Sequence, residues 1–153
     1  MSNNREIVNE TARAPARVNA SGATILLIED EASVRNLVTR YLALNNFNIV
    51  AAEDTHTAQA IWAMHKTEID LLLADVVMPN GSSVRGLVEE FQAEQPGLKT
   101  LYTSGYNVEE LNANGSLDEG VNFIQKPYRP EQLLAAVHAV LAGHFNLHAE
   151  TLC

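Results

Sequence analysis

The stretch LLLADVVMPNG, residues 71–81, decides how this chain folds. Three consecutive leucines with no polar residue between them are typical of a strand that is buried on both of its faces. Asp75 follows shortly afterwards, so a carboxylate lies at the point where this strand leaves the core. A charged side chain at the end of a buried strand calls for an explanation, and the polar residues at the ends of the other expected strands provide it.

The same arrangement, an apolar run followed by a segment with helical periodicity, recurs five times along the chain. The expected strands are TILLIED (24–30), FNIVAA (47–52), DLLLAD (70–75), KTLYTSG (99–105) and VNFIQKP (121–127). The expected helices span 31–44, 55–66, 84–94, 107–120 and 130–143. Alternating strands and helices predict an α/β fold with a doubly wound, five-stranded parallel sheet and helices on both faces.

Local signals predict where several of these helices end and which sides they bury. Asp54 and Thr55 are both acceptable N-caps for the second helix, while Pro130 is placed to start the last helix and Gly143 to end it. Trp62 in the second helix is expected to pack against the sheet. In the first helix, the apolar residues at helical spacing, which we expect to face the core, are Val34, Leu37, Val38, Tyr41 and Leu42.

Composition narrows the class of protein. The chain has 153 residues, 46% of them hydrophobic, and a net charge of -9. This length predicts one domain, and the acidity argues against unaided binding to nucleic acid or to an anionic membrane surface. A single cysteine, Cys153, excludes an internal disulfide, and no apolar run resembles a membrane span or a signal peptide. We therefore expect a cytoplasmic protein with a cationic ligand or a basic partner.

Three segments can be delimited along the chain. Residues 1–22 contain few large apolar groups, which predicts a flexible N-terminal tail. The repeated pattern covers 23–143, the expected folded domain, and leaves 144–153 as a C-terminal tail. His144 and His148 lie four residues apart in this tail, but no third ligand accompanies them, so we interpret them as surface histidines.

Polar residues follow four of the five expected strands. In doubly wound sheets, ligands bind outside the carboxyl ends of the strands. The residues at these ends are Glu29, Asp30 and Glu31 after the first strand, Asp75 after the third, Thr103 and Ser104 after the fourth, and Lys126 and Pro127 after the fifth. If the four ends share one edge, several carboxylates, a hydroxyl and an ammonium group meet in one crevice.

Each of these residues taken alone has an ordinary explanation. Glu29 or Asp30 is compatible with capping the first helix, Asp75 with a turn and Lys126 with a solvated lysine. Their joint placement favours a site instead, because clustered carboxylates protonate or bind a cation, and an all-oxygen set favours magnesium. Such an ion attracts a phosphoryl group. Asp75 is then a candidate nucleophile that forms an aspartyl phosphate, with Lys126 and Ser104 contacting the phosphoryl oxygens.

Four motifs in this order, IEDE, DVVMP, TSGY and FIQKP, resemble the response-regulator receiver domain of two-component signalling. Each motif is weak alone, but the combination is specific, and the resemblance covers about residues 24–141. It implies a flavodoxin-like sheet with the strand order 2-1-3-4-5. It also implies a phosphoacceptor signalling domain that assists its own phosphorylation and dephosphorylation, and not an enzyme.

The resemblance assigns a role to each residue of the expected site. It implies that Asp75 accepts the phosphoryl group and that Ser104 and Lys126 are the catalytic hydroxyl and lysine. The groups that it implies for Mg²⁺ are the carboxylates of Glu29, Asp30 and Asp75 and the carbonyl of Val77. The bond between Lys126 and Pro127 is implied to be cis, which a proline makes tolerable.

A conformational switch is also implied. Ser104 would move toward the phosphoryl oxygens on Asp75, and Phe123 would turn into the vacated space. The remodelled face, made by the helix at 107–120, the fifth strand and the helix at 130–143, would bind a downstream protein partner. An ordinary core aromatic is the alternative interpretation of Phe123.

The implied phosphodonor is a histidine kinase or a histidine phosphotransfer protein. We expect no room for an output domain after Gly143, so that the signal passes by protein-protein contact and not by direct binding to nucleic acid or a membrane. Two alternatives stay open. LYTSGY and FIQKPY also resemble receivers within hybrid histidine kinases, and a phosphorylation-independent scaffold receiver is a further interpretation.

Two features depart from the family or tune its chemistry. The loop after Pro79 carries Val84 where the family usually has a glycine, which puts the conformation of that loop in doubt. Val77 and Tyr106 flank the expected phosphoryl group, and two bulky groups there predict slow self-dephosphorylation.

Two other classes fit less well. A haloacid-dehalogenase-like phosphatase needs a second acid two residues after its nucleophile, where this chain has Val77. A flavin-binding protein of the same fold needs a phosphate-cradling loop after the first strand, where the acids of this chain would repel the ligand.

Overall fold

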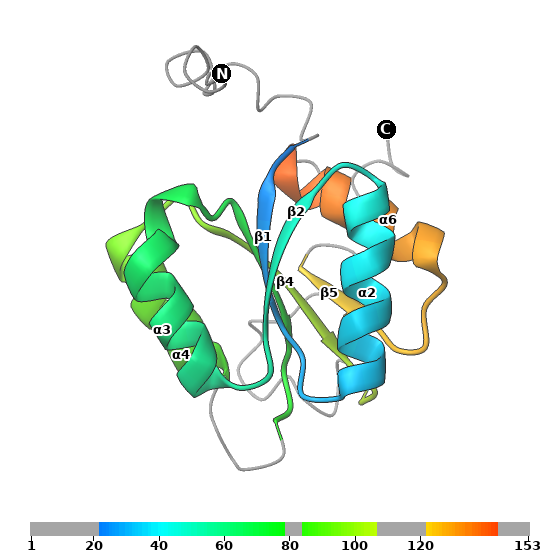
Figure 1. The fold of residues 1–153 in the computed structure, drawn as a ribbon, viewed down its shortest axis with the longest axis horizontal. Coiled ribbons are helices and arrows are strands. Elements are labelled where there is room, and N and C mark those ends of the chain that lie inside the picture. Colours follow the sequence, from blue (N-terminus) through cyan, green and yellow to red (C-terminus); the bar gives the residue numbers. More distant parts are fainter. Residues whose placement is uncertain (1–21, 79–83, 107–121, 144–153) are drawn as a thin grey trace, which may run out of the picture.

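Five parallel strands form the centre of the computed structural model, which describes residues 22–78, 84–106 and 122–143 (Figure 1). The strands are β1 (Thr24–Ile28), β2 (Asn48–Ala52), β3 (Leu71–Asp75), β4 (Lys99–Ser104) and β5 (Phe123–Gln125). They lie in the order β2-β1-β3-β4-β5, and every neighbouring pair is parallel. The predicted doubly wound sheet and its strand order are therefore confirmed.

Helices cover both faces of this sheet. They are α2 (Ala32–Leu44), α3 (Thr55–His65), the short 3-10 helix η4 (Lys66–Glu68), α4 (Val84–Glu94) and α6 (Pro130–Leu141). Figure 1 shows α2 and α6 on one face and α3 and α4 on the other. The predicted helix at 107–120, the predicted tail at 144–153 and all but the last residue of the predicted tail at 1–22 lie outside the described residues. In the part of the chain that the structure describes, no helix is both long and apolar enough to cross a membrane.

The strands are apolar on both sides because both faces of the sheet are covered. In β1, Leu26 and Ile28 lie in the core under α3 and α4, while Ile25 and Leu27 lie in the core under α2 and α6. The three leucines of β3 are divided between the two cores in the same way. The buried run that opened the sequence analysis is therefore confirmed as a central strand.

The predicted helix ends are also confirmed. Asp54 is the N-cap of α3, and its Oδ1 accepts a hydrogen bond from the backbone N–H of Thr57 (2.7 Å). Pro130 is the first residue of α6. Gly143 follows the end of α6 with φ of 78°, a backbone conformation that glycine adopts without steric cost.

Leu37 is the exception among the predicted core residues of α2. Val38 and Leu42 are buried, and Val34 and Tyr41 pack at the edge of the same core, but Leu37 is 66% exposed. The buried side of α2 centres on Val38 and Leu42, and Leu37 precedes Val38 by one residue, which is roughly a quarter-turn of the helix. Helical spacing gave the correct periodicity but placed the centre of the buried side inaccurately.

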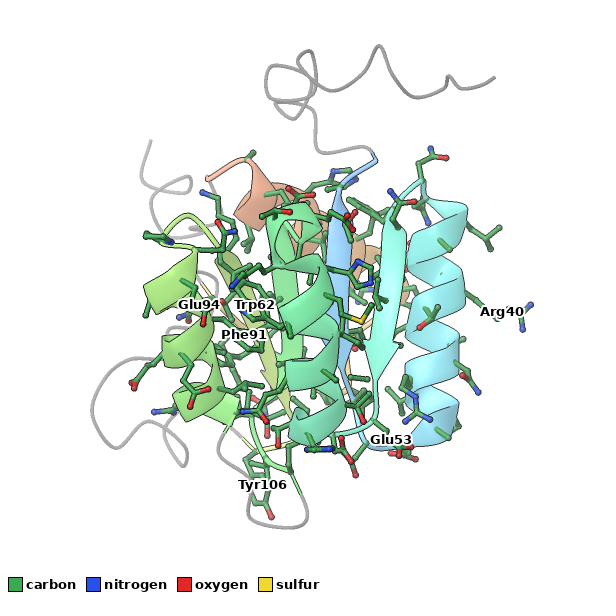
Figure 2. All side chains as sticks on the ribbon, turned by 60° about the vertical axis from the view of Figure 1, so that its left-hand side comes forward. Arg40, Glu53, Trp62, Phe91, Glu94 and Tyr106 are labelled. Carbon is green, nitrogen blue, oxygen red and sulfur yellow. The ribbon has the colours of Figure 1, made fainter. Side chains whose placement is uncertain are left out.

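Trp62 joins two helices in addition to lying in the buried cluster next to the sheet. Its ring stacks on Phe91 of α4, with 4.1 Å between the ring centroids and 7° between their planes (Figure 2). Its indole N–H donates to Glu94 Oε1 (2.9 Å), and Lys66 Nζ lies 3.0 Å from the same oxygen. The sequence indicated packing against the sheet but not this contact between α3 and α4.

Candidate functional site

The carboxyl ends of four strands bring the predicted site residues to one edge of the sheet. Asp75 ends β3 and Ser104 ends β4, while Glu29 directly follows β1 and Lys126 directly follows β5. The β4–β5 pairing extends past the end of β5, because the backbone N–H of Lys126 donates to the carbonyl oxygen of Ser104 (2.8 Å). The bond between Lys126 and Pro127 is cis, as the resemblance implied.

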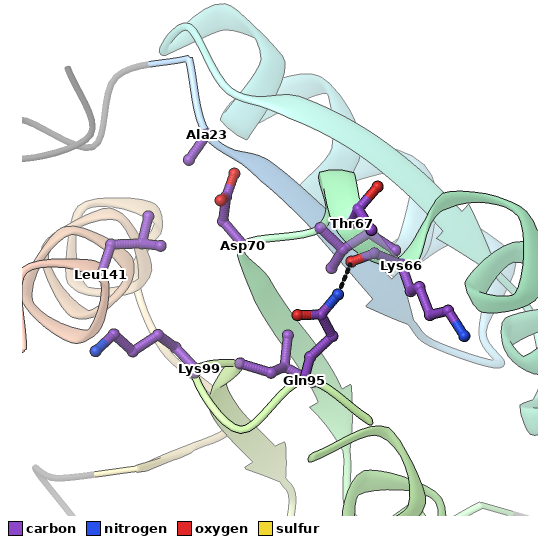
Figure 3. A pocket seen from close by; sticks show the side chains of 10 residues that line it. Ala23, Lys66, Thr67, Asp70, Gln95, Lys99 and Leu141 are labelled. Carbon is purple, nitrogen blue, oxygen red and sulfur yellow. Dashed lines mark hydrogen bonds between the residues drawn. The ribbon is translucent and has the colours of Figure 1, made fainter. Parts of the chain in front are cut away.

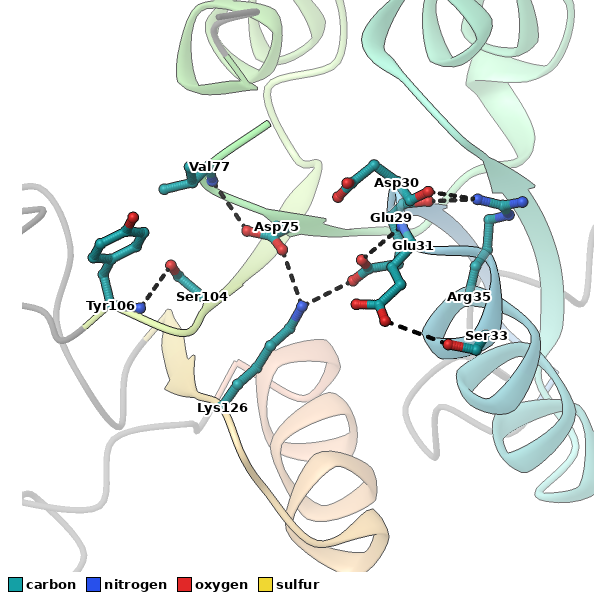
Figure 4. A network of polar contacts seen from close by, with 10 residues as sticks. All are labelled: Glu29, Asp30, Glu31, Ser33, Arg35, Asp75, Val77, Ser104, Tyr106 and Lys126. Atoms are coloured by element: carbon teal, nitrogen blue, oxygen red, sulfur yellow. Dashed lines mark hydrogen bonds and ion pairs between the residues drawn. The ribbon is translucent and has the colours of Figure 1, made fainter. Parts of the chain in front are cut away.

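Lys126 connects two carboxylates at this edge (Figure 4). Its Nζ lies 2.9 Å from Asp75 Oδ2 and 3.0 Å from Glu29 Oε1. Burial alone would lower the pKa of Lys126, but the hydrogen bonds and negative charges of Asp75 and Glu29 outweigh it and raise the pKa to about 12. The interpretation of Lys126 as an ordinary solvated lysine is therefore wrong.

Each of these carboxylates uses its second oxygen to accept a backbone hydrogen bond. Asp75 Oδ1 accepts from the N–H of Val77 (3.0 Å), and Glu29 Oε2 accepts from the N–H of Glu31 (3.2 Å). Neither Glu29 nor Asp30 caps α2, because its N-cap is Glu31, which makes no side-chain capping hydrogen bond. The backbone amides and Lys126 together hold both buried carboxylates in fixed orientations.

Three acids at this edge can reach a common cation. Glu29, Asp30 and Asp75 each offer a carboxylate oxygen, and these oxygens lie within 4.8 Å of one another. Glu29 and Asp75 are buried while Asp30 is exposed, so the group is open to solvent on one side. An all-oxygen set of this kind suits a hard divalent ion, and an open side leaves room for water ligands. The residues present therefore fit the predicted Mg²⁺.

Ser104 and Phe123 are both inaccessible to solvent. Ser104 is 1% exposed, and its Oγ accepts a hydrogen bond from the backbone N–H of Tyr106 (3.1 Å). Phe123 is 0% exposed and lies in the core under α3 and α4, opposite Tyr102 of the neighbouring strand. The phenyl ring is thus already inside the core in this structure, and its role as a switch stays a prediction.

Two exposed side chains lie at the rim of the site. Val77 is 40% exposed and Tyr106 is 55% exposed. In Figure 4 both lie across Asp75 from the acids that follow β1. Because the backbone of Val77 bonds to Asp75 and the backbone of Tyr106 bonds to Ser104, each rim side chain is tied to a residue of the site.

The sequence analysis missed Arg35 in the first turn of α2. Its Nη1 donates to the carbonyl oxygen of Glu29 (2.9 Å) and lies 3.4 Å from that of Asp30. The signal that could have indicated this contact is a basic residue one turn after three consecutive acids. Such a residue is at a suitable distance to turn back onto the loop before its own helix.

Comparisons with known proteins agree with this geometry. Residues 25–138 match the family model of the response regulator receiver domain. The chain is 30% identical over 122 residues to Sensor kinase CckA of Brucella abortus (strain 2308), which covers 80% of this chain and 13% of that protein. It is 30% identical over 129 residues to transcriptional regulatory protein CpxR of Klebsiella pneumoniae, which covers 83% of this chain and 53% of CpxR.

A solved structure supports the same assignment. The receiver domain from hybrid histidine kinase CckA is similar with a TM-score of 0.65 and 28% sequence identity, over 78% of this chain and 99% of that chain. The chain spans about half, or less, of the length of the curated relatives described above. The family model, the strand order and the joined acids and lysine at the carboxyl edge lead to one conclusion: this chain belongs to the response regulator receiver domains of two-component signalling.

Proposed function

We propose that Asp75 accepts a phosphoryl group from a phosphohistidine of a histidine kinase or a histidine phosphotransfer protein. The observation that carries this proposal is the position of Asp75 at a buried strand end, with Oδ2 2.9 Å from Lys126 Nζ and with Glu29 and Asp30 within reach of a shared cation. Positive charge on both sides of Asp75 would stabilise the oxygens of a phosphoryl group as it arrives.

The transfer replaces one bond to phosphorus with another. One carboxylate oxygen of Asp75 attacks the phosphorus atom, and the bond between phosphorus and the imidazole nitrogen of the donor breaks. The nitrogen keeps the electron pair of the broken bond. The products are an aspartyl phosphate on this chain and an unmodified histidine on the donor.

The neighbouring residues would support this transfer in separate ways. Glu29, Asp30, Asp75 and the carbonyl of Val77 would hold Mg²⁺, which when bound neutralises charge on the phosphoryl oxygens. Lys126, with a pKa raised to about 12, keeps its charge at neutral pH and would pair with a phosphoryl oxygen. The Ser104 hydroxyl still has its own hydrogen to donate to a further oxygen.

The proposal includes a switch that passes the signal to a protein partner. Ser104 would move toward the phosphoryl oxygens, and Phe123 would change its position next to the space that Ser104 leaves. The face affected would include β5 and α6, and the residues 107–120 that the resemblance adds to it lie outside the described residues. A net charge of -9 supports a protein partner and not nucleic acid.

The similarity to CckA favours a second candidate function, the receiver portion of a hybrid histidine kinase. Both candidates use the same transfer to Asp75 and differ in what precedes the domain and in which histidine donates the phosphoryl group. Reading the gene upstream of Met1 distinguishes them, because a hybrid kinase encodes its histidine-bearing and ATP-binding regions in the same frame.

Intact-mass measurement after incubation with a small phosphodonor and Mg²⁺ tests the proposal. We expect the mass of one added phosphoryl group on the wild-type chain and none on Asp75→Ala or on the wild type in a chelator. If the wild type gains no mass while an ordinary receiver does so in the same tube, phosphoacceptor function is excluded and a scaffold receiver is favoured.

A further inference from the structure

The loop between β1 and α2 consists of three consecutive acids, Glu29, Asp30 and Glu31. Like charges at adjacent positions repel each other, and Glu31 adds no side-chain cap to α2. Two of these acids nevertheless share a cation-binding geometry with Asp75 across the sheet edge. Lys126 and the N–H of Glu31 hold the Glu29 carboxylate, and a further contact holds the carbonyl groups of this loop.

Arg35 supplies such a contact from the first turn of α2. Its guanidinium donates to the carbonyl oxygen of Glu29 at 2.9 Å and approaches that of Asp30 at 3.4 Å (Figure 4). These bonds go to the backbone and leave the carboxylates themselves free for Lys126 and for a cation. Arg35 is half-buried, and both contacts come from the same nitrogen, Nη1.

The hydrogen bond to the Glu29 carbonyl, with the longer approach to that of Asp30, limits how the peptide planes of the loop can turn. The amide that completes the second plane is the N–H of Glu31, which donates to Glu29 Oε2 at 3.2 Å. Arg35 therefore orients, through the backbone, both the Glu29 carboxylate and the position from which Asp30 extends. A residue that orients the ligands of a metal ion without contacting the ion commonly affects the affinity for that ion.

We propose that Arg35 is a positioning residue that presets Glu29 and Asp30 for Mg²⁺. The inference rests on the proposed function, because it takes Mg²⁺ as the ion of this site. It assigns Arg35 no contact with the ion or the phosphoryl group. Its effect is to remove the need for the acidic loop to order itself when the cation binds.

A purely electrostatic role for Arg35 predicts the opposite result. A positive charge near a cation site repels the ion, so removing that charge would strengthen Mg²⁺ binding. Removing a positioning residue would weaken Mg²⁺ binding despite the more negative loop. The sign of the change in affinity therefore separates the two roles.

The test compares Arg35→Gln with Arg40→Gln in the full chain. Arg40 lies on the same helix, is exposed and points away from the body of the domain, so its substitution removes the same charge without touching the loop (Figure 2). Isothermal titration with Mg²⁺ is expected to show affinity about tenfold weaker for Arg35→Gln and nearly unchanged for Arg40→Gln. Equal or tighter binding by Arg35→Gln would overturn the inference.

Two further measurements keep the test decisive. Arg35→Lys retains one donor, so its affinity for Mg²⁺ is expected to lie between those of Arg35→Gln and the wild type. If Arg35→Gln does not fold, Arg35→Lys takes its place in the test and is expected to bind Mg²⁺ more weakly than the wild type. In the metal-free protein, the amide of Glu31 should exchange with solvent faster in Arg35→Gln, whereas the amide of Val77 should not. Unchanged exchange at Glu31 would refute the positioning role without reference to any metal.

These outcomes separate failure of the inference from failure of the proposed function. If the wild type binds no Mg²⁺, the proposed metal site fails, and the exchange of the Glu31 amide still decides whether Arg35 orders the loop. If the wild type binds Mg²⁺ and Arg35→Gln binds it equally well, only the role of Arg35 fails.

Discussion

The two edges of the parallel sheet differ in what they carry: charged side chains that bond to one another at the carboxyl edge, and a cavity at the amino edge. At the carboxyl edge, Glu29, Asp75 and Lys126 come from three different strand ends and bond to one another through Lys126. At the amino edge, a cavity of about 370 Å³ lies between β4, the region of η4 and the end of α6, and its lining includes Lys66, Thr67, Asp70, Gln95, Lys99 and Leu141 (Figure 3). The amino edge has a cavity, whereas the carboxyl edge has buried carboxylates bonded to a lysine.

The polar groups at the amino edge hold loops together. Asp70 Oδ2 accepts from the backbone N–H of Thr24 (2.9 Å), and Gln95 Nε2 donates to the carbonyl oxygen of Lys66 (3.5 Å). Lys66 itself is paired with Glu94 at 3.0 Å. A cavity whose polar groups serve neighbouring loops is weaker evidence of function than buried charges that face one another.

Removing one lysine from each edge tests most directly whether the two edges differ in function. Lys126→Met should slow phosphoryl uptake from a small phosphodonor about a hundredfold, because a fixed charge beside the phosphoryl oxygens is lost. Lys99→Met, which removes an exposed lysine at the amino edge, should leave the rate unchanged. Time-resolved intact mass gives both rates, and a comparable loss in the two variants would contradict the assignment of the site.

The raised pKa of Lys126 also predicts how the stability of the folded protein depends on pH. Because folding raises this pKa from 10.5 to about 12, the stabilisation from Lys126 is complete below pH 10.5 and is lost as the pH rises to about 12. Between these values, the wild type should lose more of its unfolding free energy than Lys126→Met does. Denaturant titrations at several pH values measure this, and parallel curves would contradict it.

Two leucines in and just before β4 should differ in how much they stabilise the protein. Leu101 is 0% exposed in the centre of β4, whereas Leu98 is 6% exposed and lines the amino-edge cavity. Leu101→Ala should lower the free energy of unfolding by about 4 kcal/mol and Leu98→Ala by about 2 kcal/mol, because the structure can relax next to an existing cavity. Urea denaturation measures both, and a larger cost at Leu98 would reverse the ranking.

The rim of the carboxyl edge should affect how long the phosphoryl group persists. Tyr106→Ala and Val77→Ala should each shorten its lifetime severalfold, since smaller side chains open a path for water to the phosphorus. Met64→Ala is the control, because Met64 is an exposed apolar residue of α3, 77% accessible. Loss of label from purified phosphoprotein gives the lifetimes, and an equal effect of all three variants would exclude control by the rim.

The smallest effect is expected near the amino edge, at Glu94. Hydrogen bonds from Trp62 and then from Lys66 lower the pKa of Glu94 below 4.5. Its contribution to stability is therefore complete above pH 4.5 and is lost as the pH falls through the lowered pKa. The stability difference between wild type and Glu94→Gln, measured in thermal melts, should shrink in that range, and a difference that stays constant would contradict this.

Much of the fold follows from local patterns in the sequence. The strand order was implied by family resemblance, but the buried character of β3, the N-cap Asp54 and the start of α6 at Pro130 come from neighbouring residues alone. Continuous apolar runs, side-chain caps and the conformational limits of proline act over a few residues, so one chain suffices to predict them. The residues gathered at the carboxyl edge were predicted for the same reason, since each sits at a strand end.

Only the tertiary structure decided which groups touch. Lys126 bonds to Glu29, 97 positions away, as well as to Asp75, and Arg35 turns back onto the loop that carries the acids. The exposure of Leu37 likewise depends on how α2 lies against its neighbours, not on its periodicity. Strand ends follow from the order of residues along one chain, whereas hydrogen bonds and burial depend on the distances between elements, which packing alone fixes.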